Sequence, residues 1–456
     1  MLDESANSVL HIIKWFVLAT IIGAVVGVLD AAFLQMLDNS LAARNRLPLF
    51  YFSLPVSLYI VALCARKWKP QHHDYTTDAV IHNINEYQPV SFISILKAFV
   101  LSIVTMTVGG SAGKEAPCAD VGAGISSLLG RIFRVSPQDC RKMMICGVSA
   151  GFAGVFGVPI SGALFGLEVL WVGHIFYEVM FAALVAGITA YQVTAALGVN
   201  YIYHPLAFHP IFSEQFFLKM IVAGIFFGMV SLLFIEINKF ARVVFRFITA
   251  RAGLFWTCMA GGMLLVMIGY FVSPLYLGLG MPGIHSALGG EPLQSPFGFL
   301  YKIICTSITL AAGGIGGVVT PIFFVGAQAG AMFSGFLQVD SATLAALGLV
   351  AVLAGTANTP LAASIMAIEL FGAEIAPYAT VACVISFLIT GKQSIYPHQR
   401  ITQTSGKTEI DEDVNRFKYG RRASDKKHYM PHRKTLLGHL KQEAKHLLPR
   451  TKNNRK

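Results

Sequence analysis

The sequence predicts an all-α, polytopic membrane protein made of two related halves, in which glycine-rich breaks interrupt the helices. Three observations lead to this fold class. Of the 456 residues, 55% are apolar and only 13% are charged, which is about half the charged fraction of a soluble protein. Long stretches contain no Asp, Glu, Lys or Arg, and two sequence blocks recur about 200 residues apart. This composition excludes an ordinary soluble enzyme and a disordered chain.

The apolar stretches are long enough to cross a bilayer, because ~20 apolar residues span its ~30 Å hydrocarbon core as a helix. The first runs from Val9 to about Leu37 and follows an acidic N-terminus, so it predicts a spanning helix rather than a signal peptide. A second span is expected at about 48–64. The remaining uncharged stretches are Met143–Leu167, Val179–Ser213, Ala252–Gly290, Ile303–Val339, Ser341–Ile368 and Ile375–Gly391.

The positive charge is concentrated at the C-terminal end. Residues 401–456 contain 15 Lys and Arg against 6 Asp and Glu, whereas residues 1–400 contain 20 against 18. We therefore divide the chain into a transmembrane domain, 1–400, and a basic tail, 401–456, and expect no nucleic-acid partner. Leucines at helical spacing within 432–448 fit either an interfacial helix on membrane lipids or a solvated tail.

Loop charges predict the orientation in the membrane. Arg66, Lys67 and Lys69 follow the second expected span, so they lie on the same side as the N-terminus. The positive-inside rule assigns that side to the cytoplasm. Both termini, including the basic tail, are therefore expected in the cytoplasm.

An internal repeat divides the transmembrane domain into halves of about 10–200 and 215–400. Residues 109–126 and 313–330 share glycines, a proline and small residues at a constant offset, and 147–170 resembles 348–371. Such repeats predict an inverted two-fold arrangement with a binding site at the interface of the halves. The identical pairs of the first block are Gly109/Gly313, Gly110/Gly314, Gly113/Gly317, Pro117/Pro321, Val121/Val325, Gly122/Gly326 and Ala123/Ala327.

Each half carries a glycine-rich break followed by proline, GKEAP at 113–117 and GVVTP at 317–321. Glycine permits the turn, and proline suits the first turn of the helix that follows. Each helix would then begin inside the protein, with unpaired N–H groups and a partial positive charge. Two such ends facing one cavity would bind an anion through backbone groups. The alternative is close helix packing through small residues.

Glu115 lies inside the first break. A carboxylate at a helix N-terminus in a low-dielectric setting fits a gate or a proton carrier: charged, it competes with an anion for the N–H groups, and neutral, it can leave them. The alternative is a structural carboxylate paired with Lys114. Glu168 and Glu369 occupy matching positions in the two halves, which favours a shared structural role over a transport role.

Two further motifs have competing interpretations. Residues 147–151 spell GxSxG, the pattern of a hydrolase nucleophile, but the required strand–turn–helix context is absent and the repeat partner of Ser149 is Val350. We therefore interpret Ser149 as a packing residue. Tyr396 follows the last apolar stretch, where its phenol fits either an anion donor or an interfacial aromatic residue.

These motifs resemble the CLC chloride channel and transporter family, in prokaryotic form without C-terminal CBS modules, over about residues 10–400. GKEAP resembles the block that holds the gating glutamate of the family, here Glu115, and GVVTP resembles its second anion-binding block. SIYP resembles the segment with the tyrosine that coordinates the anion. The anion-binding set that the resemblance implies is Tyr75, Thr76, Gly113, Lys114, Gly317, Val318, Val319 and Tyr396.

The sequence departs from the family pattern at four places. Ala116 replaces a glycine after the gating glutamate, and Val319 replaces a phenylalanine. HHDYTTDAVI, at 72–81, lacks the glycines of the first anion-binding loop, and Tyr75 is preferred over Asp74 there because a carboxylate repels an anion. Val169 stands where exchangers of the family carry an internal proton-accepting glutamate.

Because an apolar side chain cannot pass on a proton, Val169 favours a passive, voltage- or pH-gated chloride channel. A chloride/proton antiporter, or a transporter of another small anion such as fluoride, is the alternative, and an intramembrane enzyme is a remote one. The resemblance implies a homodimer in the inner or cell membrane of a bacterium. Seven scattered cysteines without a CxxC pair indicate neither a metal site nor a disulfide framework. No cofactor is expected.

Overall fold

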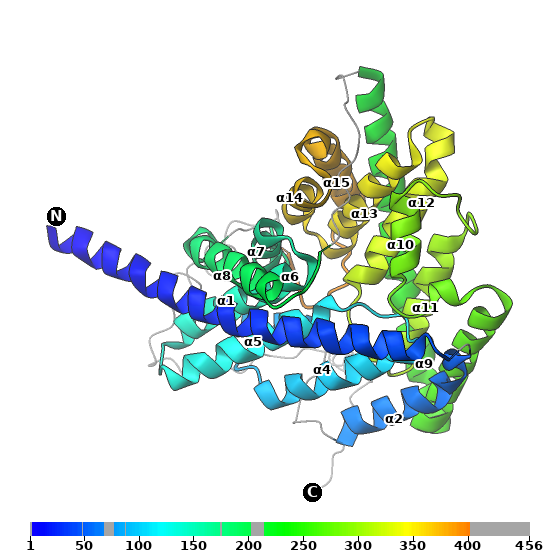
Figure 1. Cartoon of the computed structure of the whole chain (residues 1–456), viewed down its shortest axis with the longest axis horizontal. Coiled ribbons are helices and arrows are strands. Elements are labelled where there is room, and N and C mark those ends of the chain that lie inside the picture. The colour runs from blue at the N-terminus through cyan, green and yellow to red at the C-terminus, as the bar shows by residue number, and fades with distance from the viewer. Residues whose placement is uncertain are drawn as a thin grey trace, which may run out of the picture. The chain divides into compact units, whose positions relative to one another are not determined.

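The computed structural model describes residues 2–47, 49–67, 77–86, 88–173, 176–201 and 214–401. These residues belong to one compact unit, Met1–Thr402. It is built almost entirely of helices (Figure 1), as the composition predicts. The basic tail, including the expected interfacial helix at 432–448, lies outside the described residues, as do Asp74, Tyr75 and Thr76.

The first half of the unit contains eight α-helices, one 3-10 turn and a two-residue strand within the described residues. The first helix continues beyond the apolar stretch that ends near Leu37, because a helix needs no apolar residues once it leaves the hydrocarbon layer. The elements are α1 Leu2–Arg44, η1 Phe50–Ser53, α2 Leu54–Lys67, α3 Thr77–Asn85, α4 Phe92–Thr107, α5 Glu115–Ile132, α6 Pro137–Phe156, α7 Pro159–Glu168, β1 Trp171–Val172 and α8 Tyr177–Ala196.

The second half repeats this order. The long helix α9 corresponds to both α1 and α2, and it is interrupted at Gly253, whose φ of 85° lies in the left-handed region that favours glycine. The elements are α9 Glu214–Phe271, η2 Pro274–Tyr276, α10 Met281–Leu288, α11 Gly298–Ala311, α12 Val319–Leu337, α13 Ser341–Ala357, α14 Pro360–Phe371, η3 Ala373–Ile375, α15 Ala376–Thr390 and β2 Arg400–Ile401.

Equivalent local signals begin and end the repeated helices. Ser136 caps α6 by accepting from the Asp139 N–H at 3.1 Å, and Asp340 caps α13 by accepting from the Thr343 N–H at 2.8 Å. Both helices end in a left-handed residue, Gly157 and Asn358. A proline then opens the next helix in each half, because its missing N–H is not needed there.

The repeated glycines within the helices serve close packing. In the first half a Cβ on Gly122 would overlap the carbonyl of Gly147, and in the second half the same holds for Gly326 and Gly348. Helices α5 and α6, and likewise α12 and α13, therefore approach each other with backbone against backbone. The packing interpretation is thus correct for these glycines, whereas Gly113 and Gly317 have another role.

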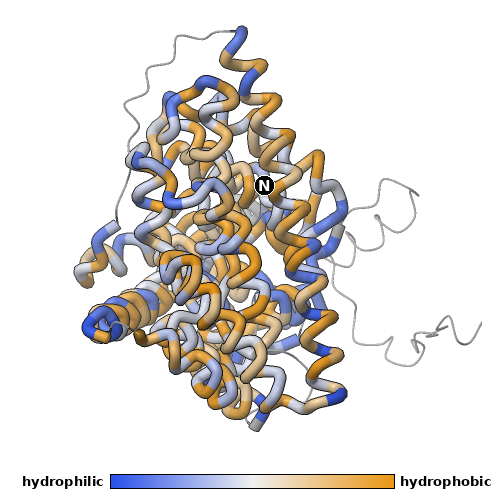
Figure 2. The backbone as a smooth tube through the Cα atoms, turned by 90° about the vertical axis from the view of Figure 1, so that its right-hand side faces the viewer, coloured by the Kyte–Doolittle hydropathy of each residue, from blue (hydrophilic) through white to orange (hydrophobic). Residues whose placement is uncertain are grey.

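The fold is that of an integral, multi-pass membrane protein. Within the described ranges, five segments are long and apolar enough to cross a membrane: Val9–Arg44, Tyr177–Ala196, Glu214–Phe271, Val319–Leu337 and Ala373–Thr390. Hydrophobic residues, coloured orange in Figure 2, occur along the helices throughout the unit. Many of them are exposed on outer helix faces, such as Leu10 and Ile13 on α1 and Phe240 on α9, which suits contact with lipid.

Glu168 and Glu369 cap helices of the opposite half. Glu168 ends α7 and accepts the N–H groups of Leu361 and Ala362 at 3.1 and 2.9 Å, at the start of α14. Glu369, on α14, accepts those of Ile160 and Ser161, both at 2.9 Å, at the start of α7. This exchange of caps is the shared structural role that their matching positions predict.

Ser149 is an interior residue, as its repeat partner suggests. It is fully buried in α6, and its hydroxyl donates to the carbonyl of Ala163 at 3.2 Å. Val350, its counterpart in α13, is also fully buried. The GxSxG pattern is therefore part of a helix–helix contact.

A short parallel pairing joins the end of the second half, strand β2, to strand β1 of the first half. Trp171 and Val172 of β1 pair with Arg400 and Ile401 of β2. Because β2 follows α15 at the end of the second half, this pairing draws the segment that contains Tyr396 across to the first half. All-α patterns do not predict such a contact.

Candidate functional site

The two glycine-rich breaks meet at the centre of the unit. Gly113 donates its N–H to the carbonyl of Gly317 at 2.8 Å, and Gly317 donates back to Gly113 at 2.8 Å. The pair forms an isolated antiparallel bridge. Because the bonded residues are equivalent in the repeat and the bonds are reciprocal, an approximate two-fold axis passes between them. The halves are thus related as an inverted repeat.

Threonines from the neighbouring helices hold both breaks in place. The Ser111 N–H donates to Thr309 Oγ1 of α11 at 3.0 Å, and the equivalent Ile315 N–H donates to Thr105 Oγ1 of α4 at 3.2 Å. Each bond joins one half to the other. These cross-bonds fix the directions in which α5 and α12 leave the centre.

The carboxylate of Glu115, the first residue of α5, lies on the N-terminus of α12. Oε1 accepts the Val319 N–H at 2.6 Å, and Oε2 accepts the Thr320 N–H at 3.3 Å and its hydroxyl at 2.9 Å. Glu115 is only 3% exposed. A helix N-terminus offers unpaired N–H groups and a partial positive charge. The carboxylate therefore occupies the position at which that helix end would bind a free anion.

Gly113 and Gly317 leave room for this carboxylate. A Cβ built on either residue would overlap the carboxyl group of Glu115. Lys114 contributes no bond to those oxygens among the described contacts; its ammonium lies 5.9 Å from the ring centre of Phe156. The contacts of Glu115 are thus with α12, and the alternative of a structural pair with Lys114 does not match this geometry.

Thr320 is a site residue that the sequence reasoning missed. Its repeat partner is Ala116, so the hydroxyl occurs in one half only. A signal was available, because a threonine directly before the proline of a break falls on the first turn of the following helix. There its hydroxyl adds a donor to the backbone N–H groups.

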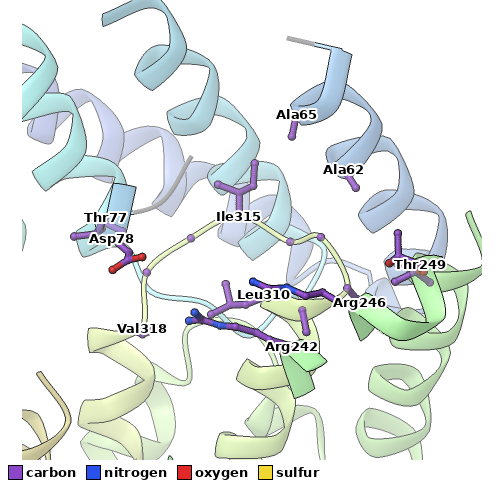
Figure 3. Close-up of a pocket in the computed structure, with 18 of the residues that line it drawn as sticks. Ala62, Ala65, Thr77, Asp78, Arg242, Arg246, Thr249, Leu310, Ile315 and Val318 are labelled. Atoms are coloured by element: carbon purple, nitrogen blue, oxygen red, sulfur yellow. Dashed lines mark hydrogen bonds between the residues drawn. The ribbon is translucent and has the colours of Figure 1, made fainter. Parts of the chain in front are cut away.

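A cavity of about 690 Å³ opens beside the two breaks. Its wall includes Ala116, which follows Glu115, Val318, which precedes α12, and Tyr396. In Figure 3, Arg242 and Arg246 extend from α9 towards the segment around Ile315, and Thr77 and Asp78 lie on its other side. Arg66 also lines the cavity, so three guanidinium groups border it. We call this cavity the basic pocket.

Several contacts hold Tyr396 at the wall of the basic pocket. The preceding Ile395 N–H donates to the Thr356 carbonyl at 3.0 Å, and the Asp78 carboxylate accepts the His398 N–H at 2.9 Å and contacts its ring Nδ1 at 2.5 Å. Tyr396 itself is 6% exposed. This burial differs from the exposure of an interfacial aromatic residue.

The valines that the sequence assigns to the anion site and to the internal proton position lie at helix ends. Val318 and Val319 lie at the start of α12, beside Gly317. Val169 is fully buried at the C-terminal end of α7. Thr77 opens α3 at the wall of the basic pocket, immediately after the expected first anion-binding residues.

The fold and this geometry define a class: helical membrane proteins made of inverted repeats, whose broken helices begin at a shared centre and form a site for a small ion. The chain belongs to the voltage gated chloride channel family, whose family model matches residues 57–391. The expected CLC resemblance is therefore confirmed. This family comprises transport proteins.

One known protein sequence and two solved structures illustrate what this chain is similar to. A "Chloride/fluoride channel protein" of Pseudomonas syringae pv. tomato is 34% identical over 421 residues, which cover 90% of this chain and 92% of the relative. The crystal structure of a CLC-type fluoride/proton antiporter matches with a TM-score of 0.79 and 26% identity, covering 85% of this chain and 98% of that one. A slow cyanobacterial Cl⁻/H⁺ antiporter shares the fold, with a TM-score of 0.73, 20% identity and coverage of 84% and 96%. The chain is therefore a CLC-type anion transport protein.

Proposed function

We propose that the protein exchanges a small anion for protons, with Glu115 as the group that carries the proton and alternates with the anion. The observation that carries this proposal is the position of the Glu115 carboxylate on the first N–H groups of α12 and on the Thr320 hydroxyl. The carboxylate resembles a bound anion in charge and in the donors that it uses. An anion and the ionised side chain therefore compete for one place.

Protonation ends this competition. A neutral carboxyl group interacts weakly with the positive helix end, so it leaves the donors to an incoming anion. Each cycle then links the movement of a proton with that of an anion. Two structurally similar proteins are described as a fluoride/proton antiporter and a Cl⁻/H⁺ antiporter. This likeness favours exchange over the passive channel that Val169 favours.

The transported anion is chloride or fluoride. Two N–H groups and a hydroxyl converge within hydrogen-bonding distance of one carboxylate, and such donors suit a small, strongly hydrated anion because they replace its water. The relative of 34% identity is named a chloride/fluoride channel protein. The test compares how strongly fluoride and nitrate each inhibit the uptake of labelled chloride. The stronger inhibitor is the anion that the donors prefer.

A passive channel is the second candidate, and one observation favours it. Val169 is apolar and fully buried, so it cannot pass on a proton.

Flux measurements on proteoliposomes separate the two candidates. With an outward anion gradient and the potential clamped by potassium and valinomycin, an exchanger takes up protons against their gradient. Under the same clamp, a channel lets the anion gradient run down without proton movement. Glu115→Gln should abolish proton uptake, because a carboxamide does not titrate. Glu236→Gln, at an exposed glutamate paired with Lys239, is the matched control and should behave as the wild type. Wild-type anion flux without proton uptake would contradict exchange.

The membrane orientation and assembly belong to the same proposal. Arg66, Arg242 and Arg246 border the basic pocket, and the positive-inside rule favours the cytoplasm for that side of the membrane. We place the protein in a bacterial inner membrane with cytoplasmic termini, as a homodimer surrounded by lipid. Cross-linking in native membranes and protease protection of the tail test these two points.

A further inference from the structure

A second buried carboxyl group, that of Asp120, lies near Glu115 on the same helix and makes no contact with the start of α12 among the described residues. Asp120 follows Glu115 by five residues in α5 and is 5% exposed. Its carboxyl group is close enough to interact with the hydroxyl of Thr77, the first residue of α3. The two groups do not meet the distance and angle of a hydrogen bond, so within the described residues neither Asp120 Oδ1 nor Thr77 Oγ1 has a geometrically formed hydrogen bond.

Asp120 differs in this respect from the acidic residues with structural roles. Both carboxylate oxygens of Glu168 accept N–H groups of α14, and Asp340 caps α13. In the part of the chain that the structure describes, Asp120 makes no such cap. A buried carboxyl group without full hydrogen bonding costs free energy, of the order of a few kcal/mol. In membrane proteins, ionisable groups retained at such a cost commonly mark a path for ions or protons.

The surroundings of Asp120 connect the gate with the basic pocket. Asp120 interacts electrostatically with Glu115 on one side. The Tyr396 phenol is also close enough to interact electrostatically with Asp120, as it is with Glu115 and Asp78. Thr77 and Tyr396 both line the basic pocket. Asp120 is therefore one side chain away from the pocket and lies near the gate carboxyl group.

We propose that Asp120 passes protons between Glu115 and water in the basic pocket. A proton leaves the neutral Glu115 carboxyl group, an O–H bond forms on the ionised Asp120, and the proton is then released to pocket water next to Thr77. Only O–H bonds break and form, so no oxidant or reductant takes part. Tyr396 and Thr77, which both line the basic pocket, act as positioning residues. The inference rests on the proposed exchange of anions for protons.

The experiment compares Asp120→Asn with Asp30→Asn in proteoliposomes. Asp30, on α1, is the matched control, because it is a fully buried carboxyl group whose oxygens also lack partners among the described residues, and it does not line the basic pocket. We expect Asp120→Asn to lower the ratio of protons to anions at least tenfold, while Asp30→Asn keeps the wild-type ratio. An unchanged ratio in Asp120→Asn would overturn the proposal. Equal losses in both variants would also overturn it, since they would indicate a general electrostatic effect.

Two milder variants carry the test if Asp120→Asn does not fold. Asp120→Glu retains the carboxyl group and should keep most of the proton coupling, whereas Thr77→Val removes the nearby hydroxyl and should lower the ratio severalfold. The proposed role of Asp120 would be contradicted if Thr77→Val kept the wild-type proton-to-anion ratio while Asp120→Glu lost proton uptake. The wild-type measurement separates the two levels of inference. If the wild type takes up no protons, the proposed exchange is wrong. If the wild type takes up protons and Asp120→Asn keeps the same proton-to-anion ratio, only the role of Asp120 is wrong.

Discussion

At the scale of single residues, the site depends on one carboxylate and a few donors. Glu115 reaches α12 because Gly113 and Gly317 lack the Cβ atoms that would fill its place. Val319 and Thr320 then supply two N–H groups and a hydroxyl. Of these three donors, the Thr320 hydroxyl is the side-chain donor, and the other two are backbone N–H groups. It is therefore the contact that mutation can remove without disturbing the backbone.

Thr320→Val should weaken the binding of the ionised Glu115 carboxylate to the N-terminus of α12, because it removes the hydroxyl that donates to Oε2. A hydrogen bond to a charged group contributes about 1.5–3 kcal/mol, so losing it should raise anion flux at neutral pH by about tenfold or more. The pH dependence of flux should flatten, because the carboxylate then leaves more readily without protonation. Initial rates of chloride efflux between pH 5 and 8 measure both effects.

Thr320→Ser is the control for this prediction, because it keeps the hydroxyl. Wild-type rates in Thr320→Val would mean that the hydroxyl does not hold the gate.

At the scale of elements, the helices are fixed by bonds that cross from one half to the other. Glu168 of α7 caps α14, and Glu369 of α14 caps α7. Thr105 of α4 and Thr309 of α11 hold the break of the opposite half. Neither half can form these contacts alone. We infer that the halves stabilise each other cooperatively.

Glu168→Ala and Glu369→Ala should each lower the free energy of unfolding by about 1–2 kcal/mol, the range for loss of a helix cap. The effects should be similar, since each glutamate caps two N–H groups. Thermal unfolding in detergent measures the loss. Glu178→Ala is the control at an exposed ion pair with Lys142, where the expected change is below ~1 kcal/mol. A change in the proton-to-anion ratio without loss of stability would contradict the capping role.

At the scale of the whole molecule, the basic pocket brings together α2, α3, α9 and the segment around Tyr396. Arg66 comes from the first half, and Arg242 and Arg246 come from the second. Guanidinium groups around a concave surface raise the local concentration of anions. We therefore expect the pocket to concentrate anions beside the two breaks, where backbone N–H groups would bind them.

Arg246→Gln should reduce anion flux by about twofold at low ionic strength, the effect of one charge at roughly 10 Å in a solvated cavity. The reduction should disappear at ~1 M salt, where charges are screened within ~3 Å. Efflux rates over a salt series measure it. Arg251→Gln, on the same helix α9 but outside the pocket, should have little effect. A salt-independent loss in Arg246→Gln would indicate a structural role instead.

Local sequence patterns determine much of this protein. The uncharged stretches predict the membrane class, because a bilayer core excludes charge. The glycine–proline breaks at 113–117 and 317–321 predict the starts of α5 and α12. The repeat predicts the two-fold relation of the halves. These features follow from the sequence because hydropathy and backbone propensity act over a few neighbouring residues.

Only the tertiary structure decided how the breaks meet and what they hold. Gly113 and Gly317, and likewise Glu115 and Thr320, bond across more than 200 residues. Tyr396 reaches the pocket through the pairing of β1 with β2 and the contact of His398 with Asp78. These contacts join residues that are far apart in the sequence, so they depend on the path of the whole chain. Local helix or turn propensity does not predict them. The sequence therefore indicates helix ends suited to an anion, and the fold determines that one carboxylate occupies them.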